Sequence, residues 1–278
     1  MKFCRFQPLE FAPGQEGRRR GPAARTAIVE GQQLVEIDGE PWRAFGRTGR
    51  SWQLAEVKLL PPAVPGKIVC VGRNYAEHAK ELGNETPQEP LLFLKPPSAI
   101  LAPEEPILLP PISQRVDFEG ELAVIISRSC RALSLGEATE PYIAGYTCLN
   151  DVTARDLQKR DGQWTRAKGF DTFCPFGPVL ETDLDLARAS VETRVNGTRK
   201  QSACLSEMIF SVDAIIRHIA QVMTLEPGDV IATGTPAGIG ALREGDVVEI
   251  TVSGIGTLRN RVARFRPRAA ERGSGDAL

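Results

Sequence analysis

The apolar and polar positions along the chain follow mainly the pattern of β-strands. Apolar runs bounded by Gly, Pro, Asn and Asp occur at "KIVCVG", "PLLFLK", "ELAVIIS", "IAGYTCLND", "CPFGPVL" and "SVETRVNG". Strand patterns return near the end, at "GDVIATG" and "GDVVEITVSGIGTLRNRV". The predicted fold class is therefore mainly β with a few helices, of the α+β kind.

Helical signals are few. "RNYAEHAKELG" predicts a short helix, which Asn74 and Glu77 would cap at its start and Gly83 would end. Residues 206–223 carry apolar side chains at the helical period. Thr153 and Asp156 stand three apart after a strand, so a third helix is expected to begin there.

The turn residues and prolines along the chain predict two domains. Residues 1–60 hold short strand patterns with turn signals and predict a small N-terminal β domain. Prolines 61, 62 and 65 mark a linker into a main domain over residues 65–265. The Arg-rich connection between residues 8 and 25 is expected to be mobile, and residues 267–278 to be disordered.

Composition excludes several classes of function. Lys plus Arg number 34 and Asp plus Glu 35, so the net charge of −1 argues against a nucleic-acid partner. The N-terminus lacks the apolar core of a signal peptide, and no run is long enough to span a membrane. The six cysteines include no CxxC pair, which favours reduced thiols in the cytoplasm over thiolate-bound zinc.

One predicted strand carries two glutamates ahead of an apolar run. Glu119 and Glu121 in "QRVDFEGELAVIIS" share a face of an extended strand, roughly 6.5–7 Å apart at Cα. Solvated acids at a strand end would explain them. The alternative is a pair of ligands to a divalent cation, which would offset the repulsion between two carboxylates.

Other polar residues have two interpretations each. Asp151, at the end of a strand, is a third oxygen ligand or a helix cap. Lys168 precedes a glycine and is either solvated or catalytic. Arg155 and Gln158 share one helical face. Thr235 lies in the Gly-rich turn "ATGTPAGIG", which lacks the lysine of a phosphate-binding loop.

The chain has only two histidines, His78 and His218. His218 lies within the apolar helix and is assigned to packing or to the surface. His78 stands three residues before Glu81, so the two side chains face one way as a general base and its orienting carboxylate. An exposed His–Glu pair on a helix is the alternative.

Six motifs, in order, resemble the fumarylacetoacetate hydrolase family over roughly residues 65–265. They are "GRNYAEHAKE", "FLKPPSAI", "DFEGELAVII", "NDVTARDLQ", "KGFDTFCPFGP" and "TGTPAGIG". The resemblance implies a β-sandwich roll and a homodimer. Residues 1–60 look like the small N-terminal domain of many bacterial members.

The resemblance also implies a role for each candidate residue. Glu119, Glu121 and Asp151 match the metal ligands of the family, which normally hold Mg²⁺ or Mn²⁺. His78 and Glu81 match its water-activating pair, and Lys168 is both catalytic and substrate-binding. The other substrate-binding positions are Arg73, Tyr75, Arg155, Gln158 and Thr235.

These residues indicate enolate chemistry on small keto-acid or dicarboxylate substrates. The first expectation is a Mg²⁺-dependent hydrolase that cleaves a C–C bond in a β-diketo acid such as an acylpyruvate. The alternative is an isomerase or decarboxylase of 2-hydroxy-diene-dioates, or a decarboxylase or tautomerase of oxaloacetate. A metal-binding dimer without activity is a third interpretation, which the presence of a base argues against.

Overall fold

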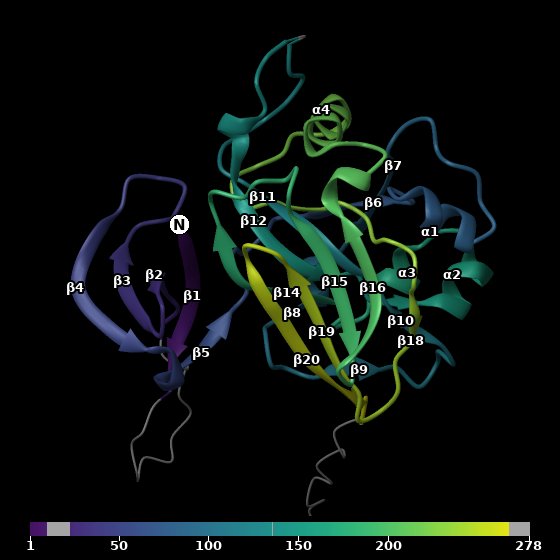
Figure 1. Cartoon of the computed structure of the whole chain (residues 1–278), viewed down its shortest axis with the longest axis horizontal. Coiled ribbons are helices and arrows are strands. Elements are labelled where there is room, and N and C mark those ends of the chain that lie inside the picture. The colour runs from purple at the N-terminus through teal and green to yellow at the C-terminus, as the bar shows by residue number, and fades with distance from the viewer. Residues whose placement is uncertain (10–22, 135, 267–278) are drawn as a thin grey trace, which may run out of the picture.

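The computed structural model describes residues 1–9, 23–134 and 136–266, and these form a mainly β structure with short helices (Figure 1). The predicted fold class is thereby confirmed. Two expectations, a mobile connection between residues 8 and 25 and a disordered tail at residues 267–278, concern segments that lie wholly or mostly outside the described residues.

The N-terminal strands lie to the left in Figure 1, beside the main body. They are β1 (Lys2–Pro8), β2 (Arg25–Glu30), β3 (Gln33–Asp38), β4 (Gly46–Gln53) and β5 (Val57–Leu60), with a 3₁₀ turn at Leu54–Glu56. The sheet does not stop at this group, because β1 also pairs with β14, placing Phe3 opposite Leu180. The proposed boundary near residue 60 stays a prediction.

Among the described residues, twelve strands form one hydrogen-bonded sheet. Beyond β1 its order is β14 (Cys174–Glu181), β12 (Ile143–Asn150), β11 (Gly120–Ile126), β17 (Val230–Ala232), β6 (Ile68–Gly72) and β7 (Leu91–Lys95), and β8 (Ile100–Leu101) pairs with β14. Every residue of β11 is buried, because both faces of this central strand are covered.

Two smaller sheets complete the body. One contains β16 (Thr198–Cys204), β15 (Ser190–Val195), β19 (Val247–Val252), β20 (Gly256–Arg264) and β9 (Ile107–Leu109). The other contains β13 (Thr153–Ala154), β10 (Val116–Phe118) and β18 (Gly240–Ala241). The five-stranded sheet packs closely on Gly120, where a Cβ atom would lie 2.1 Å from Oγ1 of Thr193.

The α-helices are short. They are α1 (Ala76–Glu81), α2 (Arg155–Asp161), α3 (Thr165–Lys168) and α4 (Val212–Val222), and 3₁₀ turns lie at Pro97–Ala99, Glu140–Tyr142 and Leu205–Glu207. The helix expected over residues 206–223 begins late, at Val212, because Ser211 caps it through the N–H of Ala214.

The two short helices expected near Asn74 and Thr153 form as α1 and α2, but both predicted cap pairs are wrong. Tyr75 precedes α1 and Ala154 precedes α2, and neither cap makes a side-chain hydrogen bond. The Asn74 amide instead donates to the carbonyl of Thr233 at 2.7 Å, and the Thr153 hydroxyl donates to the carbonyl of Asp151 at 2.8 Å. A distant carbonyl takes the Asn74 side chain, and a local carbonyl takes the Thr153 side chain, in place of the helix termini.

Candidate active site

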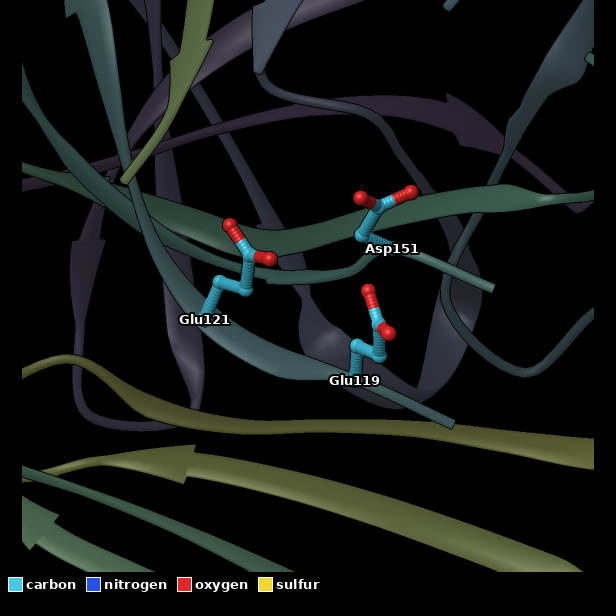
Figure 2. Close-up of side chains that lie close together, drawn as sticks. All are labelled: Glu119, Glu121 and Asp151. Carbon is cyan, nitrogen blue, oxygen red and sulfur yellow. The ribbon is translucent and has the colours of Figure 1, made fainter. Parts of the chain in front are cut away.

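Three buried carboxylates meet at the centre of the main body. Glu119, Glu121 and Asp151, here called the acidic triad, are at most 4% exposed, and one ligand oxygen from each lies within 4.8 Å of the others. Figure 2 shows the three side chains converging. The alternatives of solvated acids and of a helix-capping Asp151 are therefore wrong.

Strand pairing places the triad. In the register of β11 with β12, Gly120 stands opposite Asn150 and Glu121 opposite Leu149. The N–H of Asp151 donates to the carbonyl of Glu119 at 2.8 Å, so the residue after β12 lies beside the residue before β11. Adjacent antiparallel strands thus bring Asp151 close to Glu121 and Glu119, which lie 30 and 32 residues before it in the chain.

Buried cations surround the acidic triad. Lys168, which is 2% exposed, donates to Glu119 Oε2 at 2.7 Å and to Asp151 Oδ2 at 2.6 Å, so it is not a solvated lysine. Arg155 pairs with Glu119 and donates from Nε to Asp117 at 2.9 Å. Its Nη1 donates to Gln158 at 2.6 Å, which confirms their shared helical face.

The two glutamates have opposite electrostatic surroundings. Burial alone would raise the pKa of Glu119, but the charges of Lys168 and Arg155 outweigh it and hold that pKa well below its ordinary value. Burial raises the pKa of Glu121 well above its ordinary value, and Asp151 and Glu119 raise it further. Glu121 is therefore the acid whose negative charge a bound cation would stabilise most.

The donor set of the acidic triad fits a hard divalent cation. All three ligands are carboxylate oxygens, the type that Mg²⁺ and Mn²⁺ favour, and zinc would instead select nitrogen or sulfur. Burial lowers the local dielectric and strengthens the repulsion among three carboxylates packed this closely, so a bound cation would stabilise them.

The histidine pair lies on α1. Nδ1 of His78 is 3.2 Å from Oε2 of Glu81. His78 is only 4% exposed whereas Glu81 is exposed, so the alternative of an exposed pair holds for the glutamate and not for the histidine. Glu81 is held in turn by the N–H of Gly238, which donates to its Oε1 at 3.1 Å. With Nδ1 facing Glu81, Nε2 of His78 is left to act as the base.

One cavity of about 270 Å³ joins the acidic triad to the base. Of the predicted site residues, the cavity lining includes Arg73, His78, Glu119, Glu121, Asp151, Arg155, Gln158, Lys168 and Thr235. Glu81 contacts His78 but does not line the cavity. Tyr75 is buried at the start of α1 and does not line the cavity, so the structure gives no support to substrate contact by its side chain.

The Thr235 hydroxyl is already hydrogen-bonded. It donates to the carbonyl of Gly120 at 2.9 Å and accepts from Nε2 of Gln201 at 2.8 Å. The Gly-rich turn is thereby fixed against the strand that carries Glu121. This turn also supplies the N–H of Gly234, which donates to Oε2 of Glu121 at 2.7 Å.

Sequence reasoning missed several residues of the site. Lys95, on β7, is fully buried and donates to Asp151 Oδ1 at 2.7 Å. The sequence feature that could have indicated it is a lysine at the end of an apolar strand. Phe93 and Trp164 form an aromatic wall with ring centroids 5.1 Å apart. The Lys168 ammonium lies 4.9 Å from the centroid of Phe93.

Two family profiles match the chain. The profile described as fumarylacetoacetate (FAA) hydrolase C-terminal matches residues 67–263, and the profile described as Rv2993c-like, N-terminal matches residues 1–62. Oxaloacetate tautomerase YisK of Bacillus subtilis is 41% identical over 250 residues, which cover 84% of this chain and 82% of that protein.

Solved structures share the fold. The 2-hydroxyhepta-2,4-diene-1,7-dioate isomerase from Mycobacterium marinum is 48% identical with a TM-score of 0.83, covering 95% of this chain and 98% of the other. The fumarylpyruvate hydrolase from Pseudomonas aeruginosa, in complex with Mn²⁺ and pyruvate, is 31% identical with a TM-score of 0.68. The match covers 75% of this chain and 92% of the other.

Proposed function

The chain belongs to the fumarylacetoacetate hydrolase family, and we propose that it is a Mg²⁺- or Mn²⁺-dependent tautomerase or isomerase of small 2-oxo dicarboxylic acids. The observation that carries the proposal is a buried base, His78, in the same cavity as the acidic triad and Lys168. The names of two relatives, the tautomerase of Bacillus subtilis and the isomerase of Mycobacterium marinum, support proton transfer as the reaction.

Different residues of the site carry out the steps of a proton transfer. Nε2 of His78 takes the proton from the carbon beside the 2-oxo group, and Glu81 stabilises the imidazolium that forms. The same nitrogen then returns the proton at the product position. The acidic triad would hold the cation, which when bound supplies a positive charge to stabilise an enolate.

Positive side chains receive the substrate's carboxylates. Arg73 lines the cavity and makes none of the ion pairs found among the described residues, so its guanidinium is available to a substrate carboxylate. Lys168 keeps a fixed charge beside the acidic triad, where negative charge develops on the 2-oxo group. A dicarboxylate therefore fits the site better than a neutral ketone does.

Hydrolytic C–C cleavage is the second candidate. The His78–Glu81 pair can equally remove a proton from water, and the Pseudomonas relative is named a fumarylpyruvate hydrolase. The two reactions differ in whether water attacks a carbonyl carbon. The hydrolase expected from the sequence therefore stays a prediction.

A substrate panel separates the two candidates. Enol oxaloacetate, a 2-hydroxy-diene-dioate and an acylpyruvate are each assayed with Mg²⁺ and with EDTA, following the enol absorbance and the cleavage products separately. We expect fast, EDTA-sensitive loss of the enol without cleavage. Cleavage of the acylpyruvate at the higher kcat/KM would instead assign the protein to the hydrolases.

We also propose a cytoplasmic homodimer. The six cysteines are free, which supports a reducing compartment, and the dimer rests on the family resemblance. Among the described residues, no helix has the length and apolar character needed to cross a membrane. Light scattering coupled to size-exclusion chromatography tests the dimer: a mass near 30.3 kDa would contradict it.

A further inference from the structure

Each carboxylate of the acidic triad already has at least one oxygen bonded to a fixed donor. Asp151 Oδ1 accepts from Lys95 at 2.7 Å, and its Oδ2 accepts from Lys168 at 2.6 Å. Glu121 Oε2 accepts from the N–H of Gly234 at 2.7 Å. Glu119 accepts from Arg155 on Oε1 and from Lys168 on Oε2.

Lys95 is the donor that holds Asp151 from behind. Its side chain is 0% exposed, and Nζ also donates to the carbonyl of Val152 at 3.1 Å, so the ammonium is fixed at two points. Lys168 lines the cavity, whereas Lys95 does not. Oδ1 of Asp151 is therefore held by a lysine that does not line the cavity, and Oδ2 by one that does.

This arrangement bears on the choice of cation. Ca²⁺ takes six to eight oxygen ligands and often binds both oxygens of one carboxylate, whereas Mg²⁺ demands an octahedron and keeps several waters. A carboxylate binds through both oxygens only when both can turn to the cation. The bond from Lys95 prevents Asp151 from turning in this way.

We propose that Lys95 is a positioning residue that restricts Asp151 to one-oxygen coordination and so selects Mg²⁺ or Mn²⁺ against Ca²⁺. The inference rests on the metal site of the proposed function. Three one-oxygen ligands would suit a small cation that keeps waters and takes substrate oxygens as its remaining ligands. A larger cation would be left short of protein ligands.

The test compares the affinities of Mg²⁺ and Ca²⁺ by isothermal titration calorimetry. We expect the wild-type protein to bind Mg²⁺ at least as tightly as Ca²⁺. In Lys95→Met, Asp151 can rotate, and the ratio of the Ca²⁺ Kd to the Mg²⁺ Kd should fall by about tenfold or more. Loss of structural support alone would weaken both cations equally and leave the ratio unchanged.

Lys67→Met is the matched control. Lys67 also pairs with a buried aspartate, Asp229, and neither residue lines the cavity, so this change should not move the ratio. If Lys95→Met does not fold, Lys95→Leu, which also lacks a donor, takes its place, and if neither variant folds the preference of the wild type between Mg²⁺ and Ca²⁺ decides.

Three results would overturn the inference. Tighter binding of Ca²⁺ than of Mg²⁺ by the wild type is one, and an unchanged ratio in the Lys95 variant is another. The third, the absence of any divalent binding by the wild type, would remove the metal site of the proposed function as well. The first two leave that proposed function standing, so the failures are distinguishable.

Discussion

The ammonium group of Lys168 lies 2.7 Å from Oε2 of Glu119, deep in the protein and open only to the cavity. Burial would lower the pKa of Lys168, but Asp151 and Glu119 outweigh it and raise that pKa, so the charge is permanent at neutral pH. A permanent charge at this point can serve both the acidic triad and a substrate.

Lys168→Met keeps most of the side chain and removes the charge. We expect kcat to fall by about 10²–10³-fold, because the charge matters most where an enolate develops. Mg²⁺ affinity should change less than kcat, since the three ligands remain. Steady-state kinetics at saturating Mg²⁺, with calorimetry alongside, provide the measurement, and wild-type turnover would remove Lys168 from the mechanism.

Binding of the cation should depend on pH through Glu121. Because burial, Asp151 and Glu119 raise its pKa, Glu121 takes up a proton more readily than an ordinary glutamate in the cation-free protein, and a cation must compete with that proton. Affinity for Mg²⁺ should therefore weaken as the pH falls, by up to about tenfold per pH unit.

Titrations between about pH 6 and about pH 8 measure this slope. The Glu121→Gln variant, which has no proton to release, should bind Mg²⁺ weakly and with a flatter pH dependence. Exposed Glu77→Gln on α1 is the control and should behave as the wild type does. A Mg²⁺ affinity that does not vary with pH in the wild type would contradict the assignment.

A substitution at Gly120 tests whether the close packing of the two sheets positions the acidic triad. A Cβ atom there would lie 2.1 Å from Oγ1 of Thr193 and 2.8 Å from Cδ1 of Ile250. Gly120→Ala should lower the free energy of unfolding by about 1–3 kcal/mol and displace Glu119 and Glu121. Urea unfolding and Mg²⁺ titration measure the two effects.

The matched control is Gly46→Ala on β4, where nothing lies within 4 Å of the added Cβ. Its stability should stay within about 0.5 kcal/mol of the wild type. If both alanine variants were equally stable, the close approach of the five-stranded sheet to Gly120 would be refuted.

The sequence sufficed for the parts of the site that depend on local periodicity. Glu119 and Glu121 share a face because strand side chains alternate, and the structure places the carboxylates of both close to that of Asp151. The helical spacing of His78 and Glu81 likewise placed the pair. The resemblance to a family then joined segments that no local pattern connects.

What the sequence could not supply depends on contacts between distant segments. Lys95 closes a strand whose alternation predicts neither its burial nor its bond to Asp151, 56 residues away. Asn74 was interpreted as a helix cap, yet its amide joins two carbonyls more than 130 residues distant. Contacts with distant segments decide where such side chains lie, and the periodicity of the sequence carries no information on those contacts.

The central claim is that His78 transfers the substrate proton, and the most direct test is the rate of enol-oxaloacetate conversion by His78→Ala at saturating Mg²⁺. The other histidine, His218 on α4, supplies the control His218→Ala, since it does not line the cavity. We predict a loss of about 10²–10⁴-fold for His78→Ala and wild-type rates for the control. Equal rates for His78→Ala and the wild type would contradict the account.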